Sequence, residues 1–356
     1  MVKKRVTLAD VARAAGVSST TASLVLSGRG SELRISEAVQ RRVRATSDEL
    51  GYRPNIVSLG LRKGSTRTLG FISDSVATSQ LAGDMIKGAI DAAREQGYLL
   101  FIGETEGDPA AEKDLLDAMA DRQVDGIVLA SMFTRNRTLP AGLDRVPTVL
   151  LNTVPDGGSL LPAIVPDETR AGRSAAQLLL DAGHRQIHLV GAGPHPADVP
   201  PGTVAGIERL AGILEVLREA GLEPASGTLC DQWHPPEGWA ATRDLLAAHP
   251  EPGALICFND RLAFGAYQAL QEAGRSIPDD VSVVSFDDHP LAGWLRPGLT
   301  SFGIPHEALG RAAVERLLAA VVGGPHATSD PTDGAALLHR LEMPLHRRGS
   351  VAPAVV

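Results

Sequence analysis

Polar side chains follow several short apolar runs in the sequence, at the points where those runs end. The runs have the length and composition of buried strands, and the residues directly after them carry carboxylate or amide groups. These residues are Asp74, Asn152, Asn259, Asp260, Asp287 and Asp288. Ligands of parallel sheets bind beyond the carboxyl ends of the strands. We therefore expect these side chains to converge on one cleft and to hydrogen-bond a small polar molecule there.

Some of these residues also fit a structural role. Asn259 or Asp260 can cap the helix that follows, because a short polar side chain at that position accepts a hydrogen bond from the first helical turn. Asp288 can shape the turn before Pro290. The sequence alone leaves both kinds of role open at these positions.

The sequence lacks the short patterns that are typical of several enzyme classes. A Walker A motif, GxSxG, HExxH and GxGxxG after a strand are all absent. Gly191 and Gly193 follow a predicted strand. However, Pro194 and the absence of the third glycine of GxGxxG argue against a dinucleotide site. Neither the cysteines nor the histidines have metal-ligand spacing; they include Cys230, Cys257, His184, His188, His195 and His234. We expect a protein that is not an enzyme, with no catalytic residues, no cofactor and no metal.

The C-terminal four-fifths of the chain alternates strand and helix patterns. Apolar runs occur at residues 68–73, 98–103, 125–130, 148–151, 187–191, 254–258 and 281–286. Amphipathic stretches fill the gaps, at 80–96, 109–122, 167–182, 206–220, 237–248, 259–273 and 305–321. This alternation predicts an α/β body with parallel sheets.

The charge of the chain is divided unevenly along its length. Residues 1–67 hold 13 Lys and Arg against 5 Asp and Glu, a net charge of +8. Because the whole chain holds 34 basic and 42 acidic residues, the remainder holds 21 and 37, a net charge of −16. This asymmetry predicts that the first 67 residues bind a polyanion. The alternative is a basic solubilising arm, although such arms are usually of low complexity.

The basic segment has the pattern of three short helices with apolar periodicity. The expected N-caps are Thr7, Ser18 and Ser36, and the helices end at Gly16, Gly28 and Gly51. Asp10 stands three residues after Thr7, where the acid of a capping box would be. Two short helices across a glycine-containing turn, with a third helix in support, form a helix-turn-helix.

The second helix of a helix-turn-helix enters the major groove of DNA. Its hydroxyl groups can hydrogen-bond base edges, and a leucine can contact a thymine methyl group. The expected contacts are Ser18, Ser19, Thr20, Ser23 and Leu24. We expect Thr7, Arg29 and Arg34 to contact phosphates, which position the protein without specifying the sequence. The alternative is a small helical bundle whose hydroxyl groups are only solvated.

Two segments of the chain resemble a known family. The segment VTLADVARAAGVS at residues 6–18 resembles the opening of the lac repressor/gal repressor family of bacterial transcription regulators. The segment GYRPN at residues 51–55 resembles the junction into that family's hinge helix. The resemblance covers nearly the whole chain, and it implies a homodimer that reads a pseudo-palindromic operator in double-stranded DNA.

The resemblance places a hinge helix at residues 55–61. Seven residues are too few for a stable helix in water, so this helix would fold only on DNA or against its dimer mate. The family inserts a leucine into the minor groove, and Leu61 matches it. We expect Asn55 and Arg62 to contact the same groove. A plain linker with a buried leucine is the alternative.

For the rest of the chain, the resemblance implies the two-lobed α/β fold of periplasmic-binding-protein-like domains. The expected division is a small all-α helix-turn-helix DNA-binding domain at 1–54, a hinge helix and linker at 55–67, and an effector-binding and dimerisation domain at 68–356. Within that last domain, the expected first lobe holds about 68–165 and 300–325, and the second about 166–299 and 326–346.

The resemblance also assigns two side chains to the cleft between the lobes. Arg209 matches the family's effector-binding arginine, and Trp233 matches an aromatic that packs on the ligand. Carboxylates, amides and a guanidinium beside an aromatic face suit a sugar ring. Alternatively, Arg209 pairs with a surface acid and Trp233 packs in the core. Many relatives place glutamine where this chain has Ile304, so we expect one polar ligand contact to be missing.

These observations predict a repressor of carbohydrate-utilisation genes that a small-molecule effector, a sugar, releases from DNA. A corepressor-dependent regulator, an activator, or a sugar-binding protein without a role on DNA are the alternatives. The chain has no signal-peptide core and no run near 18 apolar residues, so we expect a cytoplasmic protein without membrane contact. No leucine heptad follows the last predicted strand, which favours a dimer.

Overall fold

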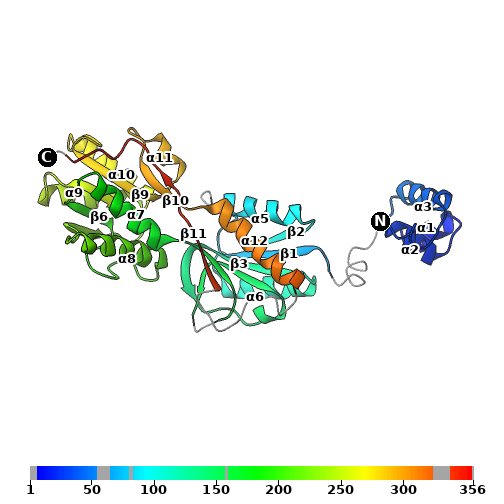
Figure 1. The fold of residues 1–356 in the computed structure, drawn as a ribbon. Helices are drawn as coiled ribbons and strands as arrows, with labels where there is room; N and C mark the ends of the chain where they lie inside the picture. Colours follow the sequence, from blue (N-terminus) through cyan, green and yellow to red (C-terminus); the bar gives the residue numbers. More distant parts are fainter. Residues whose placement is uncertain (1–5, 54–64, 80–82, 157–158, 324–336, 355–356) are drawn as a thin grey trace. The chain divides into compact units, whose positions relative to one another are not determined.

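The computed structural model describes residues 6–53, 65–79, 83–156, 159–323 and 337–354. It divides into two compact units, residues 1–66 and 67–356. Figure 1 shows the helices and strands of each unit. Among the described residues, no helix is long and apolar enough to cross a membrane.

The first unit consists of the three predicted helices, α1 (Leu8–Ala14), α2 (Ser19–Leu26) and α3 (Glu37–Glu49). Thr7 and Asp10 form the predicted capping box at the start of α1. The Ser18 hydroxyl accepts a hydrogen bond from the Thr21 amide at 3.0 Å and so caps α2. Ser36 stands at the N-cap of α3, but its side chain makes no capping hydrogen bond. A small apolar core joins the helices, made by Val11, Ala12, Ala15, Ala22, Val25 and Val43.

The second unit contains two six-stranded sheets, and each sheet forms the centre of one lobe (Figure 1). The first sheet has the order β11-β5-β4-β3-β1-β2, and the second has the order β12-β10-β9-β8-β6-β7. In the first sheet the strands are β1 (Thr68–Ser73), β2 (Leu99–Glu104), β3 (Gly126–Arg137), β4 (Thr148–Pro155), β5 (Ala163–Pro166) and β11 (Leu338–Leu341). In the second they are β6 (Ile187–Gly191), β7 (Ser226–Leu229), β8 (Gly253–Cys257), β9 (Val281–Asp287), β10 (Thr300–Gly303) and β12 (Leu345–His346).

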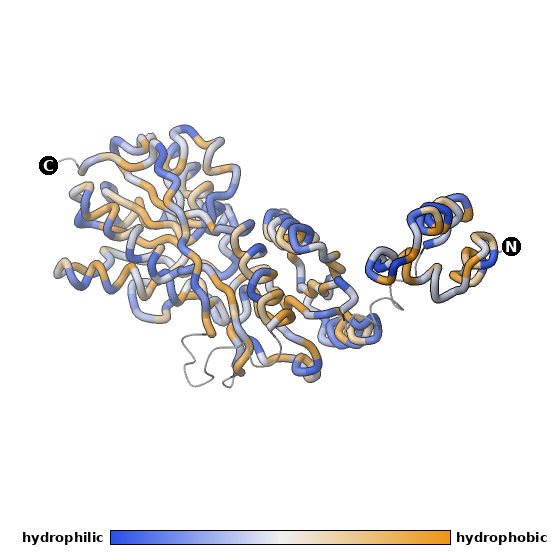
Figure 2. Tube along the Cα trace, turned by 45° about the vertical axis from the view of Figure 1, so that its right-hand side comes forward, coloured by the Kyte–Doolittle hydropathy of each residue, from blue (hydrophilic) through white to orange (hydrophobic). Residues whose placement is uncertain are grey.

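Helices cover both faces of each sheet. Around the first sheet lie α5 (Gly83–Glu95), α6 (Pro109–Asp121), a short 3-10 helix at Leu143–Arg145 and α12 (His306–Gly323). Around the second lie α7 (Glu168–Asp181), α8 (Val204–Glu219), α9 (Pro235–Ala248), α10 (Asp260–Glu272) and the short α11 (Pro290–Trp294). Figure 2 shows that the strands inside the second unit are mostly hydrophobic. Along the helices, hydrophilic and hydrophobic residues alternate. This pattern agrees with the buried aliphatic and aromatic side chains of the central strands.

Helices α5 and α12 lie side by side and approach each other closely (Figure 1). A Cβ atom added at Gly88 of α5 would overlap the carbonyl oxygen of Glu307, and one added at Gly310 of α12 would overlap that of Met85. Glycine is therefore required at both positions, because any larger residue would push the two helices apart.

All adjacent strands pair in parallel except β12, which runs antiparallel to β10. The predicted parallel α/β body is therefore confirmed, and the predicted strand at 68–73 coincides with β1. The short strands β5, β7, β10, β11 and β12 were not among the predicted runs. Strand β3 continues to Arg137, seven residues beyond its predicted end.

The predicted lobe boundaries need correction at two strands. Residues 300–303 form β10, which pairs with β9 in the second sheet, not with the first lobe. Residues 338–341 form β11, which pairs with β5 in the first sheet, not with the second lobe. The chain therefore crosses between lobes near 166–168, 303–306 and 341–345, and not at 299–300 or 325–326, where the last two predicted boundaries lie. A strand's choice of sheet depends on pairing with distant residues, which the local pattern does not contain.

Candidate functional site

In the first unit, α2 presents a hydroxyl-rich face to solvent. Ser19 and Thr20 are exposed, whereas Ser23 and Leu24 are half-buried beside the buried Ala22. The Ser18 hydroxyl is engaged with Thr21, whose own hydroxyl lies 2.8 Å away. The face thus carries small donors and acceptors of the kind that read base edges.

The residues predicted to contact phosphates lie before and after α2 in the sequence. The Thr7 hydroxyl donates to the Asp10 carboxylate at 2.7 Å, so the capping box already uses it. Arg29 is exposed and pairs with exposed Glu32 at 3.1 Å. Arg34 is exposed and has a left-handed backbone, with φ of 55°.

The loop that carries Arg29 and Arg34 is held by one buried side chain. The Gln40 amide donates to the Ile35 carbonyl oxygen at 2.8 Å and packs against buried Gly30. The predicted minor-groove residues Asn55, Leu61 and Arg62 lie outside the described residues.

In the second unit, two adjoining cavities lie between the lobes. One has a volume of about 280 Å³ and is lined by Asn152, Arg209, Trp233, Asn259 and Asp287 among others. The other has a volume of about 410 Å³ and shares Asp287 with the first. We name them the first cavity and the second cavity. Five of the eight residues that the sequence assigns to the cleft therefore line the first cavity, and Asp260 and Asp288 line the second with Asp287.

The remaining predicted residue, Asp74, does not line either of these cavities. It lines a separate cavity of about 390 Å³ at the end of β1, and its carboxylate pairs with Arg135. It also accepts a hydrogen bond from the Met132 amide at 2.9 Å. Since Arg135 lines the first cavity as well, Asp74 can position a residue of that cavity.

Arg209 is buried and bonds to several protein groups. Its guanidinium forms a two-point ion pair with Glu168, at 2.6 and 3.1 Å, and a further bond to Asp287 at 3.1 Å. It also donates to the Phe258 carbonyl oxygen and lies 4.7 Å from the ring centroid of Phe286. Burial opposes the charged guanidinium, but the charges of Glu168 and Asp287 outweigh it and raise the pKa of Arg209. The partners are therefore not surface acids.

Asp287 reaches both cavities from a strained turn. Its φ is 99° and that of Asp288 is 50°, two consecutive left-handed residues without a glycine, and each costs of the order of 1 kcal/mol or more. Asp260 stabilises the turn, because it accepts hydrogen bonds from the His289 amide at 2.7 Å and the Ser301 hydroxyl at 2.8 Å. Burial and the nearby charge of Asp287 raise the pKa of Asp260 to about 7.

The capping alternative holds for Asn259 and not for Asp260. The Asn259 side-chain oxygen accepts a hydrogen bond from the Leu262 amide at 2.8 Å, which caps α10. Its side-chain nitrogen donates to the Trp233 carbonyl oxygen at 3.2 Å. Asn259 thus both begins the helix and fixes the backbone of Trp233.

Trp233 and Asn152 stand on the two lobes that face the first cavity. The Trp233 indole donates to the Gly191 carbonyl oxygen at 3.0 Å and packs edge-on against Phe258. It lines the cavity and contacts the core at the same time. Asn152 is buried, donates to the Met132 carbonyl oxygen at 3.4 Å, and has a side-chain oxygen without a hydrogen-bond partner in the described residues.

Several cavity residues were not predicted from the sequence. Glu168 begins α7 directly after the short β5, which had no strong strand signal. Met132 and Phe133 lie on the unpredicted extension of β3, and His306 lies at a chain crossing. Ile304, the noted departure from many relatives, lines both cavities with an apolar side chain.

Comparisons with known proteins cover both units. Residues 7–55 match the family described as "Bacterial regulatory proteins, lacI family", and residues 176–351 match a periplasmic binding protein-like domain. The ribose operon repressor of Escherichia coli is 32% identical over 316 residues, 88% of this chain and 92% of the relative. The transcriptional repressor PurR of Vibrio atlanticus is 31% identical over 88% of this chain and 91% of its own length.

A solved structure shows the same arrangement of elements. The lac repressor dimer bound to operator and the anti-inducer ONPF aligns with a TM-score of 0.77 and 26% identity. The alignment covers 98% of this chain and all of the other. The predicted resemblance and the predicted fold class are confirmed: the chain belongs to the lacI family of bacterial regulatory proteins.

Proposed function

We propose that this protein is a sequence-specific DNA-binding repressor that a small-molecule effector controls. The exposed hydroxyl face of α2, within the segment that matches the lacI family, carries this proposal. The structure of the lac repressor dimer bound to operator supports it. The net charge of +8 on residues 1–67 supplies the sequence-independent attraction to DNA. We propose that the protein is not an enzyme and works in the cytoplasm.

The proposed DNA contacts follow from exposure on the first unit. Ser19, Thr20 and Ser23 offer hydroxyl groups to base edges, and Leu24 packs on a thymine methyl group. Ser18 holds the start of α2. Thr7, Arg29 and Arg34 contact phosphates, and Asn55, Leu61 and Arg62 contact the minor groove.

The proposed effector is a sugar in the first cavity. Trp233 offers an apolar face to the ring, while Asn152 and Asp287 hydrogen-bond its hydroxyl groups. Arg209 donates to the ligand beside its bond to Asp287, Asn259 positions Trp233, and Asp74 positions Arg135. The sugar releases the operator if it binds better to the lobe arrangement that separates the two hinges of a dimer.

The test of the regulator role is capture of fragmented genomic DNA by the purified protein at physiological salt, where non-specific binding is weak. We expect enriched pseudo-palindromes that are lost when one sugar of a panel is added. Enrichment that appears only after a ligand is added would identify a corepressor-dependent regulator. Absence of enrichment with every ligand would contradict sequence-specific binding.

Substitution of Asp287 with Asn is expected to abolish the response to the effector sugar and to leave operator binding without sugar unchanged. The Asp287 side chain reaches both cavities, and the substitution removes a charged acceptor that the ligand would hydrogen-bond. Operator binding, followed by fluorescence anisotropy with and without the sugar found by capture, measures both effects. The control Asp244→Asn changes an exposed acid outside the cavities. If the Asp287 variant still responds to the sugar, Asp287 does not belong to the effector site.

We also propose a homodimer that forms through the edge of the first sheet. Strand β2 is one of the two edge strands of this sheet, and Leu99 and Phe101 lie on the same face of it, 63% and 42% exposed. An apolar edge strand of this kind is normally covered by a partner. A second copy can cover it symmetrically.

Substitution of Phe101 with Asp is expected to convert the dimer to a monomer and to weaken operator binding at least about tenfold, because linked half-site binding is lost. Sedimentation velocity measures the first effect and anisotropy the second. Leu160→Asp is the control, since Leu160 is also exposed but lies outside β2. A variant at Phe101 that stays dimeric would place the dimer contact elsewhere.

A further inference from the structure

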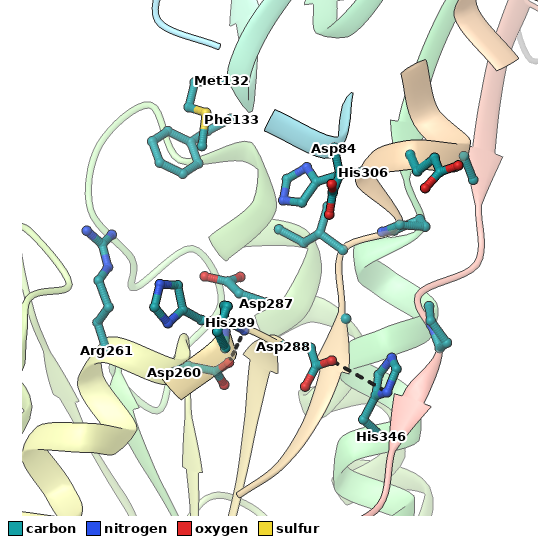
Figure 3. A pocket seen from close by; sticks show the side chains of 17 residues that line it. Asp84, Met132, Phe133, Asp260, Arg261, Asp287, Asp288, His289, His306 and His346 are labelled. Carbon is teal, nitrogen blue, oxygen red and sulfur yellow. Dashed lines mark hydrogen bonds and ion pairs between the residues drawn. The ribbon is translucent and has the colours of Figure 1, made fainter. Parts of the chain in front are cut away.

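The second cavity adjoins the first and is the larger of the two. Its walls come from both lobes and from the chain crossing at 303–306, as Figure 3 shows. The two cavities share Met132, Phe133, Arg261, Asp287 and Ile304. One ligand can therefore pass from the first cavity into the second beside these shared residues.

The polar lining of the second cavity consists mainly of hydrogen-bond acceptors. Asp84 lies beside His306 on one side, and Asp287 and His289 lie on the other (Figure 3). Burial lowers the pKa of both histidines, which favours neutral imidazoles. His306 can then accept a hydrogen bond from a ligand, whereas His289 already accepts one from the Leu291 amide at Nδ1 and can donate from Nε2. Of the described lining residues, only Arg261 carries a fixed positive charge. This lining suits an uncharged group with several hydroxyl donors and disfavours a phosphate or carboxylate.

The junction between the two cavities is mostly apolar. Three of the five shared residues, Met132, Phe133 and Ile304, offer no hydrogen bond from their side chains. A ligand that spans both cavities should therefore be polar at its two ends and less polar in the middle. Two sugar rings joined by a glycosidic ether have this distribution of polar groups.

We propose that the effector is a two-ring sugar, with one ring against Trp233 in the first cavity and the other between Asp84 and His289 in the second. The glycosidic link lies beside Ile304. This inference rests on the proposed function, because it takes the effector to be a sugar.

The first experiment compares matched pairs of ligands by isothermal titration calorimetry on the full-length protein. Glucose is paired with maltose and cellobiose, galactose with lactose and melibiose, and mannose with mannobiose. We expect at least one two-ring sugar to bind ten or more times tighter than its single-ring partner. A single-ring sugar that binds as tightly as its two-ring partners would overturn the inference.

The second experiment fills the second cavity. Ala308 lines it from an exposed position in the first turn of α12, so Ala308→Phe blocks the space without disturbing the core. We expect this variant to lose the tenfold preference while single-ring binding stays unchanged. Ala319→Phe is the matched control, an exposed alanine of the same helix outside the cavities, and it should keep the preference.

The outcomes separate this inference from the proposed function. If Ala308→Phe keeps the preference for two rings, the second cavity does not hold the second ring. The inference then fails, and the proposed function stands. If no sugar of either size binds while operator capture succeeds, the sugar class in the proposed function fails, and the inference fails with it.

Discussion

Substitution of Arg209 with Met is expected to lower the free energy of unfolding of the second unit by about 3–5 kcal/mol. The loss arises because Glu168, buried with its partner, must then either keep a charge without compensation or take up a proton, and burial already raises its pKa. Asp287 loses its partner as well, so the effector response should disappear. All three tryptophans, Trp233, Trp239 and Trp294, lie in the second unit. Denaturation followed by tryptophan fluorescence therefore reports on that unit alone.

Two further variants show whether the buried charge causes this effect. Arg173→Met removes a more exposed arginine that pairs with Glu215 and Glu219, and should cost less than about 1 kcal/mol. The double variant Arg209→Met, Glu168→Gln should recover part of the loss, because the uncompensated charge is gone. A loss at Arg209 no larger than that at Arg173 would contradict a structural role for the ion pair.

Substitution of Asp260 with Asn is expected to change how stability depends on pH. Burial raises the pKa of Asp260 to about 7 in the folded protein, against about 4 when unfolded. The folded state thus favours the protonated carboxyl, and that contribution is lost as the pH rises from about 4 to 7. Three pH units correspond to about 4 kcal/mol, an order-of-magnitude value. Asn stays neutral, so the stability of the variant relative to the natural protein should rise over this range.

Denaturation of both proteins at several pH values between 4 and 8 measures the difference. Only residue 260 differs between the two proteins, so subtraction reduces the contribution of other titrating groups. Asp279→Asn, which replaces an exposed acid, is the control variant. A constant difference for the Asp260 variant would show that this carboxyl is ionised throughout.

Much of the fold could be predicted because its signals are local. The run at 68–73 is apolar and bounded by polar residues, and it forms β1. The capping box of Thr7 and Asp10 needs only residues three apart, and it forms as predicted. The sheet membership of β10 and β11 depends on pairing with β9 and β5, far away in the sequence, and it was predicted wrongly.

The predictions for the candidate site also succeeded where the signal was local and failed where it depended on packing. Asn152 and Asp287 follow recognisable apolar runs, and both line the first cavity. Asp74 also follows such a run, but its carboxylate pairs with Arg135 and does not line that cavity, a choice set by packing. Glu168 was missed because β5, which precedes it, is only four residues long.

The glycine contacts between α5 and α12 have a mechanical consequence. His306, in the first turn of α12, lines the second cavity, and α12 extends for 18 residues from there, about 27 Å. Gly88 and Gly310 bring the two backbones together so tightly that neither helix can slide without displacing the other. The pair is therefore expected to move as one rigid unit. If the proposed effector pushes on His306, we expect α5 to shift together with α12.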